Sequence, residues 1–179
     1  MDTSKNELII QAKETFTALM ETLEAFTPDN FNQAPPLGGW TAGQVAEHLL
    51  LSAGVIEVIA GRTQTPQRPA AEMVEPIAAI FLDFTTKLQS PDFIIPAPGD
   101  YDQHTQIGRL KTAWAKLKEG VRLLDLNAVC LDFELPGMGH LTRLEWIWFY
   151  VFHTQRHLRQ FQRLLIPAPT HHRLPLPGR

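Results

Sequence analysis

The chain has 179 residues, a formal net charge of −3 and one cysteine. This length suits one domain with a substantial core, so we expect a single domain over residues 1–179. The charge offers no basic surplus for phosphates, which excludes a general nucleic-acid binder. One cysteine rules out an internal disulfide, and we find neither a signal peptide nor an apolar run long enough to span a bilayer. We therefore expect a cytoplasmic protein that does not bind membranes.

The first two predicted helices cover residues 5–26 and 41–60. In the first, apolar residues recur at steps of three and four. It ends at a proline, and residues 27–40, rich in proline and glycine, are expected to form a loop. The second begins at Thr41, which with Gln44 has the spacing of a capping box. It is apolar on most sides, so we expect it to be buried.

The middle of the chain contains a shorter predicted helix and a long one, at residues 72–88 and 104–126. Loops are expected before, between and after them, and the proline-rich stretch 90–103 is expected to lie over the core. Cys130 falls in the apolar part of the last loop. No basic residue or helix start adjoins it to lower its pKa, so we interpret it as a packing residue and not a nucleophile.

The last predicted helix, residues 142–166, begins with a second capping box, Thr142 and Glu145. His153 and His157 lie one turn apart on an aromatic face, which we expect to point inward. The opposite, polar face is expected to be in contact with solvent. It consists of Gln155, Arg156, Arg159, Gln162 and Arg163.

Together these elements predict an all-α protein, a four-helix bundle with an additional shorter helix and long proline-rich loops. We find no convincing sheet and no internal repeat. Residues 167–179 are proline-rich and are expected to be a tail, which contains His171 and His172.

The helical histidines are His48, His153 and His157. Buried imidazoles need a partner at each ring nitrogen, and a divalent metal shared by three of them is one solution. Three imidazoles leave at least one metal position open, as in catalytic sites. The alternative is that these side chains are hydrogen-bonded core residues. We set aside the remaining histidines, which lie in or beside loops or in the tail: His104, His140, His171 and His172.

Several polar residues lie near the three histidines in the sequence or on the same helical faces. Gln44, Tyr150 and Gln160 are candidates to hold a metal's water or a substrate, although hydrogen bonding within the core is our preferred interpretation. Glu47 follows a different face from His48, so we do not expect it to be a ligand. We interpret Glu145 as a helix cap and find no obvious carboxylate general base.

The stretch WTAGQVAEHLL at residues 40–50, followed far downstream by LTRLEWIWFYVFHTQRHLRQFQRLL, resembles the DinB-like (DinB/YfiT) family of metalloenzymes. The insertion SPDFIIPAP and the lead-in PGMGHLT fit the same pattern. The resemblance covers most of the chain. It implies a four-helix bundle, often dimeric, and it matches His48, His153 and His157 one for one with the family's metal ligands.

The resemblance also implies a class of reaction. Related members are thiol-dependent transferases or isomerases that use bacillithiol, mycothiol or glutathione. We therefore expect a metal-dependent enzyme of the thiol-dependent S-transferase type acting on a small molecule, as a homodimer. The alternatives are a metal-dependent hydrolase of small amides or esters and a non-catalytic, stress-related bundle protein. Imidazole suits Zn, Ni, Fe or Cu. We expect zinc or nickel, with iron or manganese as alternatives.

Overall fold

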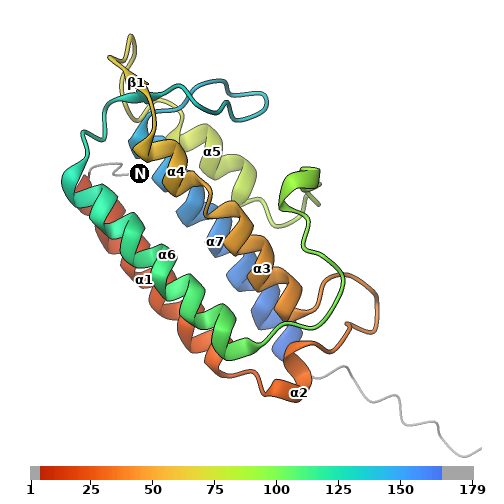
Figure 1. Cartoon of the computed structure of the whole chain (residues 1–179). Coiled ribbons are helices and arrows are strands. Elements are labelled where there is room, and N and C mark those ends of the chain that lie inside the picture. Colours follow the sequence, from red (N-terminus) through yellow and green to blue (C-terminus); the bar gives the residue numbers. More distant parts are fainter. Residues whose placement is uncertain (1–4, 167–179) are drawn as a thin grey trace, which may run out of the picture.

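The computed structural model describes residues 5–166, and most of the regular structure in this range is helical (Figure 1). The helices and strands, in chain order, are α1 (Lys5–Glu24), α2 (Pro28–Phe31), α3 (Ala42–Ser52), α4 (Val55–Ala60), β1 (Thr63–Gln64), α5 (Val74–Phe81), the 3₁₀ turn η1 (Asp92–Ile94), α6 (Gln103–Leu123), β2 (Val129–Cys130) and α7 (Arg143–Leu165).

The described helices form the predicted four-helix bundle. Three of its helices are α1, α6 and α7. The fourth position is filled by α3 and α4, which follow one another end to end (Figure 1). Helix α7 packs against α1, α3, α4 and α5, so it lies at the centre of the arrangement. Helix α5 is the additional shorter helix and lies on α7. The bundle therefore places both histidines of α7 beside the helix that carries His48.

Both predicted capping boxes are present. The Thr41 hydroxyl accepts a hydrogen bond from the Gln44 backbone N–H at 3.1 Å, and the Gln44 side chain accepts from the Thr41 N–H at 3.0 Å. Thr142 and Glu145 make the same exchange at 3.2 and 2.8 Å. Each box satisfies two donors that a helix start leaves unpaired, so it fixes the first residue of α3 and of α7.

Two predicted helices differ in extent from those observed. The predicted helix 41–60 is interrupted at Ala53 and Gly54, where the backbone N–H groups bond to carbonyls three residues back and tighten the turn. The predicted helix 72–88 ends at Phe81. Beyond it, the Asp83 carboxylate accepts hydrogen bonds from Thr85 and Thr86, and such local bonds compete with a helix.

Two loop predictions also need correction. The segment 27–40 contains the one-turn helix α2, which begins at a capping box made by Thr27 and Asn30. The loops around residues 63 and 129 pair as a two-stranded antiparallel sheet, although no sheet was expected. Each strand has two residues, which is too short for an alternating pattern to be visible.

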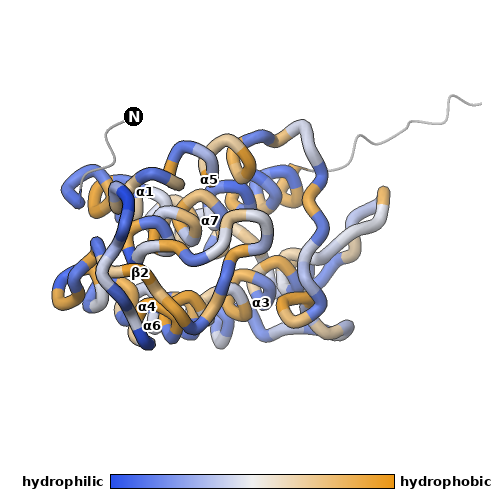
Figure 2. The backbone as a smooth tube through the Cα atoms, turned by 90° about the horizontal axis from the view of Figure 1, so that it is seen from above, coloured by the Kyte–Doolittle hydropathy of each residue, from blue (hydrophilic) through white to orange (hydrophobic). Residues whose placement is uncertain are grey.

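The core extends along the bundle as two clusters of buried apolar residues. Along the helices, apolar and hydrophilic residues alternate, as expected where one face is buried (Figure 2). Cys130 is fully buried, and burial raises its thiol pKa to about 11. The thiol therefore stays protonated at neutral pH, and Cys130 is a packing residue of the core, as predicted.

Residues 42–60 are also long and apolar enough to span a membrane, judged by length and composition alone. Within the described residues this is the single stretch that meets that test. About half of it, 56%, is buried inside the bundle, where α3 and α4 pack against α6 and α7. A core helix of a folded domain meets the same criterion, so the evidence for a membrane span is weak.

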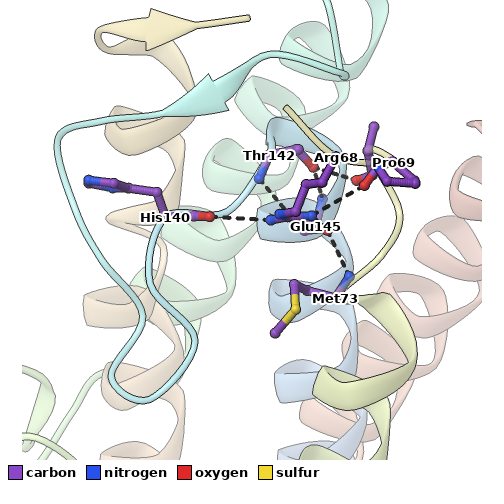
Figure 3. A network of polar contacts seen from close by, with 7 residues as sticks. Arg68, Pro69, Met73, His140, Thr142 and Glu145 are labelled. Carbon is purple, nitrogen blue, oxygen red and sulfur yellow. Dashed lines mark hydrogen bonds and ion pairs between the residues drawn. The ribbon is translucent and has the colours of Figure 1, made fainter. Parts of the chain in front are cut away.

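A buried ion pair ties the loop before α5 to the start of α7 (Figure 3). The Glu145 carboxylate is fully buried and accepts two hydrogen bonds from Arg68, at 2.5 and 2.7 Å. It also accepts from the backbone N–H groups of Met73 and Thr142, both at 2.8 Å. Glu145 is therefore the predicted helix cap and, in addition, the anchor of the 68–73 segment.

We predict that Glu145→Gln destabilises the protein by about 3 kcal/mol, because it leaves the Arg68 guanidinium without its buried partner. Urea unfolding followed by circular dichroism measures the change. The control is Glu119→Gln, which removes a solvent-exposed carboxylate paired with Arg122 and should leave the unfolding midpoint where it is. Equal midpoints for the wild type and Glu145→Gln would contradict this role.

Candidate metal centre

The structure brings the three predicted histidines together. His48 comes from α3, and His153 and His157 come from successive turns of α7. The Nε2 atom of His153 lies 3.1 Å from Nε2 of His48 and 2.9 Å from Nε2 of His157. All three side chains are buried, with exposed fractions between 1% and 9%. One nitrogen from each ring thus faces a common point in the bundle interior.

Hydrogen bonds on the far side of two rings fix where their protons are. Nδ1 of His48 lies 2.7 Å from the Ile94 carbonyl oxygen, and Nδ1 of His157 lies 2.9 Å from Oε1 of Gln160. Both oxygens only accept hydrogen bonds, so each Nδ1 carries the hydrogen and each Nε2 keeps its lone pair. In a neutral ring this is the tautomer that binds a metal through Nε2.

Burial keeps these rings neutral. Desolvation lowers the pKa of His157 to about 3 and that of His48 below its ordinary value. For His153, burial and the two neighbouring rings hold the pKa well below the usual range. A protonated imidazole cannot bind a metal, so neutrality at physiological pH prepares all three rings as ligands.

The donor set fits a divalent cation. In a tetrahedral site with Zn–N bonds of about 2.05 Å, the nitrogens lie roughly 3.3 Å apart. The two spacings from His153 are close to this value, and all three ligand atoms lie within 4.8 Å of one another. Without a cation, the lone pairs of His48 and His157 compete for one hydrogen on His153. Nδ1 of His153 is buried and has no hydrogen-bond partner among the described residues, so no neighbouring group at Nδ1 fixes the tautomer of that ring. Among the described residues, these three histidines could hold a metal ion.

The polar residues that were candidates to hold a metal's water or a substrate make hydrogen bonds within the fold. Gln160 accepts from His157, Gln44 closes the capping box of α3, and the Tyr150 hydroxyl donates to the Leu49 carbonyl at 3.3 Å. As expected, Glu47 is not part of the histidine cluster, and its carboxylate pairs with Arg109 at 2.7 Å.

The other described histidines, His104 and His140, lie outside the centre. His140 lies 3.1 Å from Glu134 in the loop before α7, and His104 is exposed near the start of α6. The predictions for His171 and His172, and for the tail, concern positions outside the described residues.

A cavity of about 480 Å³ adjoins the three histidines, and all of them line it. Its walls come from α3, α4, α5 and α7 and from two loops, residues 88–94 and 133–138. The rim reaches the surface, because Phe93 is 65% exposed and Ile80 is 43% exposed. The proline-rich segment that we expected to lie over the core thus forms one wall. This volume is in the range of small-molecule sites.

One predicted solvent-facing residue of α7 belongs to this cavity instead. Arg156 lines it, and its guanidinium donates to the Asp83 carbonyl at 2.7 Å, to the Phe81 carbonyl at 3.4 Å and to the Thr86 carbonyl. These carbonyls are left unpaired where α5 ends, so the early end of α5 draws Arg156 inward. Helical periodicity alone could not reveal this contact.

The fold and the site define a helical bundle with a three-histidine centre open to a cavity. A family model described as the DinB superfamily matches residues 11–161, so the chain belongs to the DinB superfamily. The crystal structure of TT2238, a four-helix bundle protein, is similar with a TM-score of 0.58 and 20% identity. The match covers 89% of this chain and 99% of that one. At this identity the likeness supports the fold alone. No curated protein matches the chain.

We predict that the purified protein binds one Zn²⁺ or Ni²⁺ per chain. His153→Ala should lower the affinity at least about a hundredfold, because it removes the nitrogen that lies between the other two. Isothermal titration of the metal-free protein measures the affinity. His104→Ala, which removes an exposed imidazole, is the matched control and should bind as the wild type does. Equal affinity in the wild type and His153→Ala would contradict the assignment.

We predict that the metal-free protein loses stability as the pH falls below about 6.5. Unfolded histidine takes up a proton there, whereas folded His157 does so only at about pH 3. The unfolded state then binds more protons, so the free energy of unfolding decreases with falling pH. The slope is at most about 1.4 kcal/mol per pH unit for each buried histidine. Urea unfolding between pH 7.5 and pH 4 measures it, and a slope unaltered in His157→Gln would contradict the prediction.

Proposed function

We propose that this DinB superfamily protein is a metal-dependent enzyme, a thiol-dependent S-transferase that acts on small molecules. The observation that carries the proposal is the position of the three Nε2 atoms at the wall of an apolar cavity. Such a centre holds a metal by three protein ligands and leaves room for a further ligand from the cavity side. A divalent cation bound there would lower the pKa of a thiol and polarise it for attack.

The chain's own residues supply the remaining requirements. The Ile94 carbonyl and Gln160 hold two imidazoles in the tautomer that presents Nε2. Aromatic side chains pack against the centre and would lower the water content around a bound metal. Phe149 stacks on His153 with ring centroids 5.7 Å apart, and Phe81 meets the same ring edge to face, also at 5.7 Å. Low water content strengthens electrostatic interactions in such a cavity and limits competing hydrolysis.

Hydrolysis of a small amide or ester is the second candidate. Cleavage of an amide requires protonation of the leaving nitrogen, which a positioned acid usually provides. Among the described residues that line the cavity, none is an aspartate or glutamate. This composition favours thiol transfer, in which the thiol proton can pass to solvent. A non-catalytic, stress-related role is the third candidate, and a cavity that reaches the surface weighs against it.

The assembly and location that we expect are part of the same proposal. We propose a homodimer that works in the cytoplasm, on the grounds of the family resemblance and of the lone, buried cysteine. Light scattering of the purified protein tests the dimer independently of any activity. The metal remains open among zinc, nickel, iron and manganese, because imidazole nitrogen accepts several of them.

The test of the reaction is turnover of an activated aryl chloride with glutathione, bacillithiol or mycothiol. In this reaction the C–S bond forms, chloride leaves and the thiol proton passes to solvent. We predict turnover by the metal-loaded wild type and a loss of about a hundredfold or more in His153→Ala. His104→Ala is the control and should keep the wild-type rate. Ester hydrolysis without thiol would instead support the hydrolase, and no activity with any thiol would refute the transferase.

A further inference from the structure

The cavity beside the histidines has an unusual charge composition. Its described lining is mostly aliphatic and aromatic, with no aspartate, glutamate or lysine. Arg156 is the one charged residue in that lining. With neutral histidines, the net charge of the cavity wall is therefore positive, and a bound divalent cation would add to it. A ligand that enters such a cavity gains the most favourable electrostatic interaction if it carries negative charge.

Arg156 is placed to meet an anion. The hydrogen bonds described for its guanidinium all go to backbone carbonyls, and no carboxylate of the described residues forms an ion pair with it. These bonds hold the guanidinium in position without neutralising it. A fixed guanidinium beside a cavity is suited to bind carboxylate oxygens.

A second residue of the same wall has a buried polar atom without a partner. Trp146 is 2% exposed, lines the cavity and has no hydrogen-bond partner for its indole Nε1–H among the described residues. Trp146 and Arg156 are ten residues apart on α7, which is about 15 Å along the helix axis. Between them the wall is apolar, since Phe149 lies 5.4 Å from Trp146 between ring centroids.

We propose that the cavity binds an elongated, apolar carboxylate. Its carboxylate lies at Arg156, next to the histidine centre, and its hydrocarbon body lies along the aromatic wall. Trp146, at the far end, donates to a second, neutral acceptor on the ligand. If the proposed function holds, the substrates of the enzyme are molecules of this class. Only this identification of the ligand as a substrate rests on the proposed function.

Binding to the metal-free protein tests the proposal without turnover. Isothermal titration compares octanoate, 1-octanol and octylamine, which share a chain length and differ in charge. We expect octanoate to bind at least about tenfold more tightly than either of the others, because only octanoate offers negatively charged acceptors to a charged donor. Equal binding of the three, or tightest binding of octylamine, overturns the proposal. This comparison uses the wild type, so it does not depend on the folding of any variant.

Variants then assign the two donors. Arg156→Gln should weaken the binding of octanoate about tenfold or more. Arg156→Lys should retain part of the preference for octanoate over 1-octanol and octylamine, because it keeps the charge. Arg159→Gln is the matched control, since it removes an arginine that is on the same helix but does not line the cavity. If Arg159→Gln weakens octanoate as much as Arg156→Gln does, general charge explains the binding and the assignment to Arg156 is overturned.

For Trp146 the probe is monomethyl suberate, which adds an ester carbonyl to the far end of the octanoate chain. We expect Trp146→Phe to weaken it about fivefold or more while octanoate binding changes little. Trp148→Phe is the control, because the Trp148 Nε1–H is also buried and unpartnered but does not line the cavity. Equal effects of both variants overturn the role of Trp146. Thiol turnover without carboxylate binding would refute this inference and leave the proposed function intact. Carboxylate binding without thiol turnover would refute the proposed function and leave this inference intact.

Discussion

Three imidazole nitrogens that face one point in an apolar interior constrain the rest of this structure. Nε2 of His153 lies 3.1 Å from that of His48 and 2.9 Å from that of His157, and burial keeps the rings neutral. Two of the rings have their proton fixed on the outer nitrogen by an oxygen acceptor, from Ile94 and from Gln160. Without a cation, His153 can donate one hydrogen to only one of the inner lone pairs of His48 and His157, so the other is left without a donor. A shared cation resolves this, and the same lone pairs would otherwise be a cost to folding.

The surrounding fold serves to hold two helices in register around that point. Capping boxes fix where α3 and α7 begin, and the ion pair of Glu145 with Arg68 anchors the segment before α5 to the start of α7 (Figure 3). A shift of one residue along either helix would turn a histidine by about 100° away from the others. The loop that carries Ile94 then links the centre to the cavity, since it both orients His48 and forms part of the cavity wall.

Helix positions and the histidine cluster could be predicted from the sequence because each depends on local periodicity or on short motifs. Thr41 with Gln44, and Thr142 with Glu145, mark two helix starts, and the spacing of His153 and His157 places both on one face. The cavity could not be predicted, because helices and loops far apart in the sequence together form its walls. Arg156 shows why: its place on a polar arc suggested solvent, whereas the early end of α5 supplies carbonyls that draw it inward. The short strands and the break at Gly54 likewise depend on tertiary contacts.

X-ray absorption at the zinc edge of the Zn²⁺-loaded protein tests whether the three histidines bind one metal, because it reports the number, type and distance of the bound atoms. We predict three imidazole nitrogens at about 2.0 Å, with a further light atom completing four-coordination. A zinc ion bound by fewer than three imidazoles, or by carboxylate oxygens in their place, would contradict it.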